Sequence, residues 1–369
     1  MSDRFLDDLN APQREAVQHT EGPLLVLAGA GSGKTRVITR RIAHIVARKL
    51  AKPPQILAVT FTNKAAEEMR TRVGELVGGA IAKEIMLTTF HSFCVRVLRS
   101  HIHHIGYRKD FSISSEGDTR TLVRRILGDL DGARETFSPQ LLQAAISLHK
   151  NGCEAPPPAE GQRAKAAEET EAKYRTWLPE FIESYQSALR AANSLDFDDL
   201  LVLTLELWRK EPEVLARFQQ HYHYVLVDEY QDTNRVQYDL LRALIEVRRN
   251  LCVVGDDDQS IYGWRGADSR HILAFDRDYP DAHIVTLDQN YRSTETILAA
   301  ANAVIANNTE RRAKNLWSTL GKGRPIEWIV TGDEEHEAKA IMQWLMHIRN
   351  KANAAYNDFA ILYRSNLQS

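Results

Sequence analysis

Short runs of consecutive apolar residues recur along the chain, and most are followed by a stretch whose apolar positions have helical spacing. Such runs, rich in Val, Ile and Leu, predict strands that are buried on both faces, as in a parallel sheet covered by helices. They lie at Pro23–Ala28, Ile56–Phe61, Tyr224–Val227, Leu251–Val254 and His283–Leu287. Helical spacing follows at Lys34–Arg48, Asn63–Leu76 and Asn234–Val247. This alternation predicts an α/β fold with right-handed crossovers.

The middle of the chain has a different pattern. From about His91 to Leu207 it is mostly helical, without a convincing buried strand, and Gly152 and Pro156–Pro158 interrupt the helices. We interpret this stretch as a helical insertion within the first α/β domain. A second α/β unit is expected to start near Asp281, with further strands at Ile326–Val330 and Phe359–Tyr363.

Charge is unevenly distributed along the chain. The 369 residues carry 47 Lys and Arg against 49 Asp and Glu, a formal net charge of −2. The segment 1–110, however, contains 17 basic and 10 acidic residues. The N-terminal part of the chain is therefore basic, and the rest of the chain is acidic. Such an asymmetry is compatible with an anionic partner or with a chance partition of surface charge. A near-zero net charge therefore does not exclude a protein that binds nucleic acid.

Other features of the composition exclude several classes of protein. No apolar run is long enough for a transmembrane helix, and the acidic start lacks the apolar core of a secretory signal. Cys94, Cys153 and Cys252 form no C-x-x-C pair, which argues against a zinc knuckle or a disulfide framework. We expect a cytoplasmic protein without a membrane partner.

A glycine-rich loop stands between the first predicted strand and the first predicted helix. Its sequence is Ala28-Gly29-Ala30-Gly31-Ser32-Gly33-Lys34-Thr35. Glycines let successive backbone N–H groups surround phosphates, and the helix N-terminus adds its positive dipole end. Lys34 is expected to neutralise the β- and γ-phosphates, while the Thr35 hydroxyl ligates Mg²⁺. The alternative, a glycine-rich turn that binds nothing, is the weaker interpretation after a buried strand.

Acidic residues end two of the other predicted strands. Asp228 and Glu229 follow Tyr224–Val227, where Asp228 is expected to hold Mg²⁺ and Glu229 to orient or deprotonate the attacking water. Gln259 follows the next strand and is a candidate contact for the γ-phosphate or the water. For Asp256–Asp258 we favour a solvated turn over a second metal site, because three consecutive carboxylates are not expected to share one face.

At this point the motifs resemble those of the UvrD/Rep/PcrA family of superfamily-one DNA helicases, in that family's order and over nearly the whole chain. The loop is the family's usual variant, with Ala28 at its first position. The other matching segments are Leu9–Gln13 (Q motif), Thr60–Ala66 (Ia), Thr88–Phe93 (Ib), Leu195–Leu200, Asp228–Asp232 (II), Gly255–Gly266 (III) and Gln289–Ser293 (IV). The residues at Asn234–Tyr238 and Glu334–Ala338 resemble Rep slightly more than the other members of the family.

The resemblance implies a role for each matching residue at the nucleotide. Gln13 would contact the adenine edge, and Tyr291 would stack on the ring with Arg36 beside it. Gln259 and Arg292 would contact the γ-phosphate, and Arg292 would act from the second core domain as an arginine finger does. Arg265 would link the nucleotide side to the DNA side.

Aromatic residues beside the polar motifs suit a track for single-stranded DNA, which is held by base stacking and by basic groups along the phosphates. The candidates are Phe61, Phe197, Tyr262 and Trp264, with Asn63, Lys64 and His91 as contacts to phosphate or sugar. The alternative for an aromatic residue is core packing. We expect core packing for Phe90 and Phe93, give it even weight for Phe197, and do not expect it for Trp264.

The resemblance implies a RecA-like fold. The first core domain is expected at residues 1–90 and 199–280, the α-helical insertion at 91–198, and the N-terminal half of a second core domain at 281–369. Because nothing like motifs V and VI follows, we expect an N-terminal fragment.

The function implied is an ATP- and Mg²⁺-dependent 3′→5′ helicase or translocase. It would act on single strands and on junctions of single and double strands, with repair or replication proteins as partners. The alternatives are a helicase–nuclease subunit similar to RecB and AddA, or an ATP-gated DNA-binding module without turnover.

Overall fold

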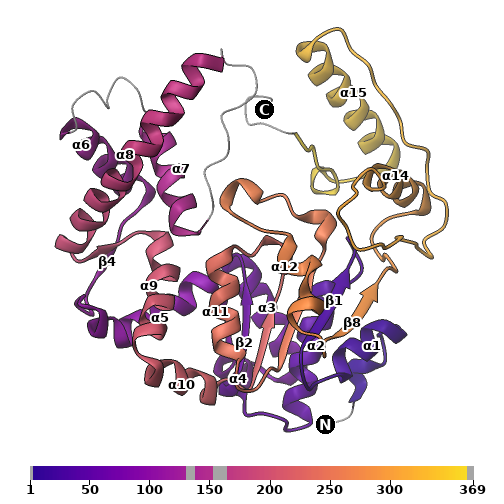
Figure 1. Cartoon of the computed structure of the whole chain (residues 1–369). Helices are drawn as coiled ribbons and strands as arrows, with labels where there is room; N and C mark the ends of the chain where they lie inside the picture. The colour runs from indigo at the N-terminus through magenta and orange to yellow at the C-terminus, as the bar shows by residue number, and fades with distance from the viewer. Residues whose placement is uncertain (1–2, 130–137, 153–163, 364–369) are drawn as a thin grey trace.

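The computed structural model describes residues 3–129, 138–152 and 164–363; for residues 3–4, 164–177 and Arg265 it describes the backbone alone. A six-stranded sheet lies at the centre (Figure 1). Every strand pairs in parallel with its neighbours. In spatial order the strands are β3 (Met86–Thr89), β2 (Ile56–Thr60), β6 (Tyr224–Val227), β7 (Leu251–Gly255), β1 (Leu24–Ala28) and β8 (His283–Leu287).

Helices cover both faces of the sheet, which explains why the strands are continuous apolar runs rather than alternating ones. Along β1, Leu25 and Leu27 enter one core, whereas Leu24, Val26 and Ala28 enter the other. The helices around the sheet are α1 (Ala11–Gln18), α2 (Lys34–Ala47), α3 (Asn63–Val77), α4 (Gly79–Glu84), α5 (Phe90–His101), α9 (Phe197–Lys210), α10 (Pro212–His221), α11 (Arg235–Ile245), α12 (Arg270–Leu273) and α13 (Phe275–Asp278). The predicted α/β fold with a parallel sheet is confirmed.

The helical insertion has a small core of its own. It consists of α6 (Glu116–Asp129), α7 (Pro139–Lys150) and α8 (Ala164–Ala191), with the short parallel pair β4 (Ser112–Ile113) and β5 (Ser194–Leu195) at its base. Its apolar cluster includes Val123, Leu142, Phe181 and Leu189. The predicted Pro156–Pro158 interruption and Cys153 lie outside the described residues.

Two segments pack with the first core domain although we assigned them elsewhere from the sequence. The apolar side of α5, which includes Phe93 and Val97, belongs to the main core on one face of the sheet. Strand β8 pairs with β1 along its whole length, from His283 to Leu287. The sheet therefore includes the strand with which the second unit was expected to begin.

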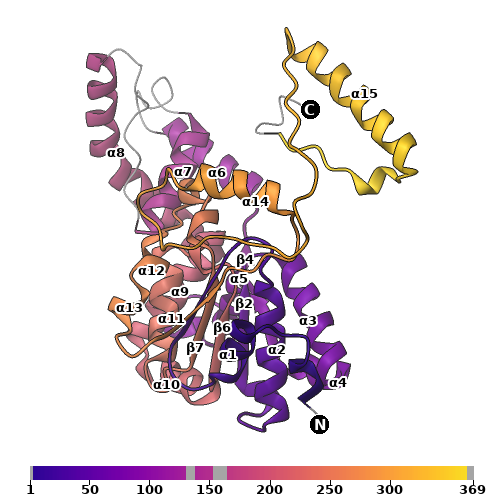
Figure 2. The same ribbon diagram turned by 90° about the vertical axis from the view of Figure 1, so that its right-hand side faces the viewer.

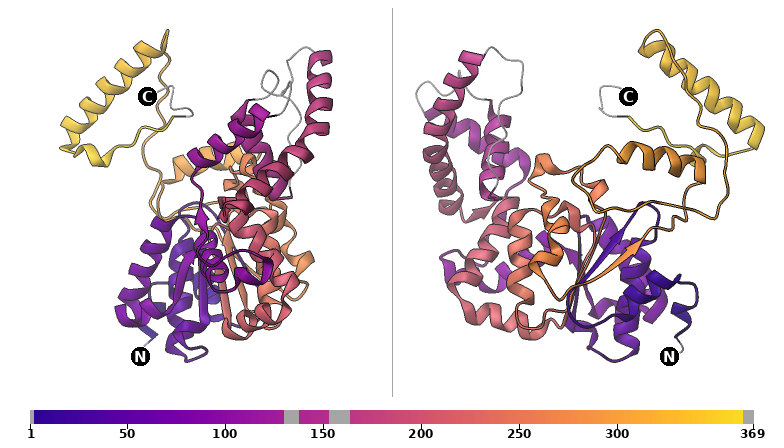
Figure 3. Two further views of the ribbon diagram at one scale, coloured as in Figure 1. Left: turned by 90° about the vertical axis from the view of Figure 1, so that its left-hand side faces the viewer. Right: turned by 45° about the vertical axis from the view of Figure 1, so that its right-hand side comes forward.

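The remaining residues carry α14 (Glu295–Ile305) and α15 (Glu334–Ala352). Figures 2 and 3 show α15 and the insertion helices projecting from the same end of the core, on opposite sides. The predicted strands at Ile326–Val330 and Phe359–Tyr363 are wrong, because neither segment pairs with a strand in the part of the chain that the structure describes. Trp328 is 87% exposed and Leu362 is 93% exposed. An apolar run becomes a strand only where a neighbouring backbone satisfies its N–H and C=O groups. Among the described residues, no helix combines the length and the apolarity that crossing a bilayer requires.

Candidate functional site

The glycine-rich loop joins the buried end of β1 to the first turn of α2. Gly31 and Gly33 have φ of +68° and +93°, in the left-handed region that glycine adopts without strain. The Ser32 hydroxyl donates to the Gly29 carbonyl at 2.7 Å and fixes the bend of the loop. The first N–H groups of α2 have no intrahelical acceptor, so they and the helix dipole face whatever lies in the loop. This geometry suits an anion such as a phosphate group.

Lys34 and the acidic pair after β6 lie at the same edge of the sheet, because parallel strands end together. The Lys34 ammonium lies 3.5 Å from Glu229 Oε2. Asp228 is buried, and its N–H donates to the Val59 carbonyl, which continues the ladder to β2. Glu229 has φ of +51°, a left-handed conformation that ends the strand and turns the chain. The predicted trio of Lys34, Asp228 and Glu229 is thus brought together.

The Asp228 carboxyl is in an environment that opposes its charge. Burial and the neighbouring Glu229 carboxylate raise the pKa of Asp228 to about 7, although the Glu229 N–H and Lys34 work against this rise. Burial and Glu229 also raise the pKa of Asp232 to about 6. A divalent cation would stabilise the ionised form of Asp228, and a carboxylate with a hydroxyl is an oxygen donor set that Mg²⁺ prefers. The buried Asp228 carboxylate therefore fits the predicted metal, while the ligand role of Thr35 stays a prediction.

Gln231, to which we assigned no role from the sequence, joins the ends of β6 and β7. Its amide nitrogen donates to Glu229 Oε2 at 2.9 Å, and its amide oxygen accepts from the Asp256 N–H at 3.0 Å. The side chain is almost completely buried. This bridge fixes Glu229 relative to the turn that carries Gln259.

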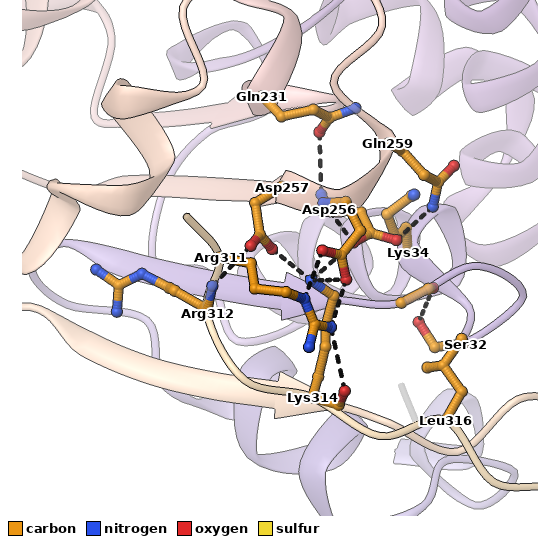
Figure 4. Close-up of polar contacts among 12 residues, drawn as sticks. Ser32, Lys34, Gln231, Asp256, Asp257, Gln259, Arg311, Arg312, Lys314 and Leu316 are labelled. Atoms are coloured by element: carbon orange, nitrogen blue, oxygen red, sulfur yellow. Dashed lines mark hydrogen bonds and ion pairs between the residues drawn. The ribbon is translucent and has the colours of Figure 1, made fainter. Parts of the chain in front are cut away.

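The turn after β7 differs from the solvated turn that we favoured. Asp256 is extended, and Asp257–Gln259 form a 3-10 turn that gathers the three consecutive carboxylates on one side. Their centre is filled by the Lys314 ammonium, which contacts Asp256 Oδ1 at 2.9 Å, Asp258 Oδ2 at 2.8 Å and also Asp257 (Figure 4). The solvated-turn interpretation is wrong because the tight 3-10 turn places these side chains around a cation. With that cation in place, the cluster offers no vacant metal site.

A second basic residue completes this cluster. Arg311 donates to both carboxylate oxygens of Asp258, at 2.8 and 2.7 Å. Burial raises the pKa of Asp258, but the hydrogen bonds from Arg311 and Lys314 outweigh it and hold that pKa below its usual value. The backbone N–H of Arg312 donates to Asp257 at 2.8 Å. The only sequence signal for these contacts is the opposite charge of two short segments more than 50 residues apart.

The side chain of Gln259 is bonded to the cluster of Asp256–Asp258 and does not simply extend into solvent. Its amide nitrogen donates to Asp256 Oδ2 at 2.5 Å. Figure 4 shows its side chain on the same side as Lys34. Its predicted contact with the γ-phosphate stays a prediction.

The amide of Gln13 is already bonded within the protein. Its nitrogen donates to the Ser32 carbonyl at 2.8 Å, and its oxygen accepts from the Asn10 N–H at 3.2 Å. Asn10 in turn donates to the Tyr291 hydroxyl at 2.9 Å. Gln13 and Tyr291, both predicted at the adenine, are therefore linked through Asn10. The adenine contact of Gln13 stays a prediction, and the contacts described here tie α1 to the phosphate loop.

Residues after β8 lie directly against the phosphate loop. Asn290 donates to the Ala30 carbonyl at 2.6 Å, and the Tyr291 N–H donates to the Gly31 carbonyl at 3.0 Å. A Cβ at Gly31 would lie 2.9 Å from the Arg292 Cβ, so Arg292 is adjacent to the loop while its side chain is exposed. Arg36 is exposed on α2, 4.0 Å from Asp8. The predicted set of Tyr291 and Arg292 thus lies beside the loop.

The predicted DNA-contacting aromatics have two kinds of environment. Phe61 is partly buried, with its ring edge-to-face against the buried Phe90. The ring centroids of His91 and Phe197 lie 5.4 Å apart, and Phe197 is 58% exposed. Burial lowers the pKa of His91. The core positions expected for Phe90 and Phe93 are confirmed.

The turn that follows Gln259 carries exposed aromatic side chains. Tyr262 is 41% exposed and Trp264 is 70% exposed. Asn63 and Lys64 are exposed at the start of α3. Arg265 ends a 3-10 turn, but its side chain lies outside the described residues. The side chains of Tyr262, Trp264, Asn63 and Lys64 are thus exposed to solvent, as a DNA track requires.

Comparison with known proteins agrees with this geometry. Residues 9–280 match the family described as "UvrD/REP helicase N-terminal domain", and residues 285–369 match "UvrD-like helicase C-terminal domain". Several curated relatives carry the name "ATP-dependent DNA helicase PcrA". One from Leuconostoc citreum is 48% identical over 98% of this chain and 47% of its own length. One from Staphylococcus aureus strain Mu50 is 46% identical over 99% of this chain and 49% of its own length.

A third relative of that name, from Bacillus subtilis, is 45% identical over all of this chain and 49% of its own length. The chain therefore spans about half the length of the curated relatives it matches. The aligned region covers the whole chain, and the family match includes the phosphate loop, the acidic pair and the turn that carries Gln259. The chain belongs to the UvrD/REP helicase family, and its parallel sheet is that family's RecA-like core.

Proposed function

We propose that this chain binds ATP with Mg²⁺ at its phosphate loop and forms the nucleotide-hydrolysing part of a DNA helicase that moves 3′→5′ along single strands. The observation that carries the proposal is the contact of Lys34 with Glu229, beside the buried Asp228. A cation on a phosphate loop and an acidic pair on a separate strand are the two parts needed for metal-assisted phosphoryl transfer.

Each part has a distinct task in hydrolysis. The backbone N–H groups of Gly31 to Lys34 would bind the phosphate oxygens, and the Lys34 ammonium would offset the charge on the γ-phosphate. Asp228 and Thr35 would hold Mg²⁺, which neutralises phosphate charge when bound. Glu229 would then exchange Lys34 for a water molecule and take a proton from it as that water attacks the γ-phosphorus. The bond from this phosphorus to the bridging oxygen would break at the same time, so that ADP and phosphate leave.

DNA binding follows from the surface beside this site. Exposed aromatic rings of Trp264, Tyr262 and Phe197 would stack on bases, while Lys64 and Asn63 would contact the phosphate backbone. The turn that bears Tyr262 and Trp264 begins three residues after Gln259. A change at the nucleotide would therefore have a short path to the DNA. The printed names of the relatives, all helicases, favour this function over a helicase–nuclease subunit.

For the 369-residue chain itself we expect nucleotide binding and weak single-strand binding, with little hydrolysis and no processive unwinding. The test is equilibrium binding of a fluorescent, non-hydrolysable ATP analogue, with and without Mg²⁺. Lys34→Ala should weaken binding by tenfold or more, since it removes a charged contact worth about 1.5–3 kcal/mol. Lys339→Ala is the matched control, because Lys339 lies on the exposed surface of α15, where it pairs with Glu335. Absence of saturable, Mg²⁺-dependent binding by the unaltered chain would contradict the proposal.

A further inference from the structure

Gln259 is held by a chain of contacts that begins in the second unit. Its amide nitrogen donates to one oxygen of Asp256, and the other oxygen of Asp256 contacts the Lys314 ammonium. The side chains of Asp256 and Lys314 are 3% and 2% exposed. The orientation of Gln259 thus depends on a carboxylate whose own position depends on Lys314.

The charge balance of this cluster makes Lys314 necessary. Three carboxylates lie around two cationic side chains, Lys314 and Arg311, which leaves a net charge of −1. Without Lys314 the net charge becomes −2, with no counter-ion at the centre. Like charges at this distance repel strongly where water is excluded, so the turn would open to separate them. Opening this turn moves Gln259.

The segment that carries Lys314 also touches the phosphate loop. A Cβ placed on Gly29 would lie 2.2 Å from Leu316 Cδ2, so Leu316 covers the start of that loop. Leu316 is held by Asn302 of α14, which donates to its carbonyl at 2.9 Å and accepts from its N–H at 3.2 Å. Figure 4 shows that Lys314 and Leu316 lie on one segment of chain and that both extend toward the nucleotide site. One segment of the second unit therefore contacts both the phosphate loop and the turn of Gln259.

We propose that Lys314 is a positioning residue that sets the orientation of Gln259 toward the γ-phosphate and transmits movement of the second unit to it. The inference rests on the proposed function, because it needs a nucleotide in the phosphate loop. It adds a residue to which neither the motifs nor the family resemblance gives a role. A movement of α14 would shift Lys314, and Asp256 and Gln259 would follow.

The first test compares ATP with ADP, since only ATP has the phosphate that Gln259 is to contact. Affinities of Lys314→Met are measured with Mg²⁺, using a fluorescent non-hydrolysable ATP analogue and fluorescent ADP. We expect the affinity for the ATP analogue to fall about tenfold, the size of one lost hydrogen bond to a charged group, and that for ADP to change less than about twofold. The matched control, Lys339→Met on exposed α15, should change neither.

A second variant separates positioning from folding. Lys314→Met combined with Asp257→Asn restores the net charge of the cluster to −1 but still lacks the contact with Asp256. The melting temperature of the double variant should be closer to that of the unaltered chain than the melting temperature of Lys314→Met is. The ratio of ATP to ADP affinity should stay as low as in Lys314→Met. This variant provides the measurement even when Lys314→Met does not fold.

Three outcomes would overturn the inference. An unchanged ratio of ATP to ADP affinity in a folded variant excludes a role at the γ-phosphate. An equal loss of both affinities shows a structural role alone. Failure of the unaltered chain to bind either nucleotide overturns the proposed function itself, and the inference with it, and is recognised without any variant.

Discussion

The ammonium group of Lys34 lies 3.5 Å from the carboxylate of Glu229, although the two residues follow strands that are separated by β7 in the sheet. The contact exists because β1 and β6 are parallel and end at the same edge. The Gln231 amide nitrogen donates to the same carboxylate oxygen, Glu229 Oε2, at 2.9 Å. Glu229 is therefore fixed at the position where a γ-phosphate and its attacking water are proposed to lie.

Replacing Glu229 with glutamine should separate binding from hydrolysis. Glu229→Gln retains the shape of the side chain and an oxygen for Gln231, but it loses the basic carboxylate. Binding of the ATP analogue should stay within about threefold, whereas any ATP hydrolysis should fall about 100-fold or more, the usual contribution of a general base. Parallel binding and phosphate-release assays measure the two effects. Retention of full hydrolysis by Glu229→Gln would exclude Glu229 as the base.

Asp228→Asn should stabilise the chain in the absence of Mg²⁺. The pKa of Asp228 is raised to about 7 by burial and by Glu229, from an ordinary value near 3.8. A carboxyl whose pKa is higher in the folded state lowers stability as pH rises from about 4 to 7, and the full cost is present above pH 7. The neutral amide removes that cost, so the melting temperature at pH 8 should rise by about 2 °C or more.

The same comparison at two pH values and with metal is the control for Asp228→Asn. At pH 4 both forms are largely neutral in the folded state, and the difference in melting temperature should nearly vanish. Added Mg²⁺ should stabilise the unaltered chain and not Asp228→Asn. A variant that is less stable than the unaltered chain at pH 8 would contradict the raised pKa.

Trp264→Ala should weaken binding of single-stranded DNA without affecting the fold. Trp264 is 70% exposed, so its removal leaves no cavity, while loss of one base stack costs about 1–3 kcal/mol. Fluorescence anisotropy with a labelled oligonucleotide should show a loss of affinity of fivefold or more, while circular dichroism should show a folded chain. Trp328→Ala is a suitable control, since Trp328 is also exposed but lies far along the chain from the predicted DNA contacts. Equal effects of the two variants would argue against a defined track.

Gly255→Ala should destabilise the bridge between β6 and β7. A Cβ at Gly255 would lie 2.7 Å from Gln231 Oε1 and 2.9 Å from Ile272 Cδ1, so the buried Gln231 would have to move. Overpacking of this kind costs about 1–3 kcal/mol. Unfolding in denaturant measures this loss of unfolding free energy. Gly74→Ala, within α3, is the matched control, because a Cβ there would lie 3.7 Å from its nearest neighbours, Ala82 and Gly79 of α4, and alanine should be neutral or stabilising.

Lys150→Met should destabilise the insertion at its base. Lys150 is 3% exposed and contacts Asp196 at 2.6 Å and Asp199 at 2.8 Å, so its removal leaves two carboxylates buried without their counter-ion. Breaking such a pair from one side costs about 3–5 kcal/mol. Lys210→Met, which removes an exposed pair with Glu206, should cost about 0.5 kcal/mol or less. Similar unfolding midpoints for the two variants would contradict a buried ionic cluster.

Local patterns were sufficient for most of the first core domain. The apolar run Leu251–Val254, the helix that begins at Lys34 and the buried Phe90 all depend on residue spacing within a few turns of chain. The patterns failed at Ile326–Val330 and Phe359–Tyr363, whose composition suits strands but which pair with no strand among the described residues. Whether a run forms a strand depends on a partner that its own residues do not specify.

By itself, then, the sequence determined most α/β elements of the first core domain, the phosphate loop at Gly29–Thr35 and the acidic pair Asp228–Glu229, because local turn chemistry and periodicity specify them. Only the tertiary structure decided that β8 extends the sheet beside β1, that Gln13 bonds Ser32, and that Lys314 sits among three aspartates. The physical reason is the range of the interactions. A charge pair across more than 50 residues depends on how two folded units lie together, and such pairs have no period or spacing along the chain to mark them.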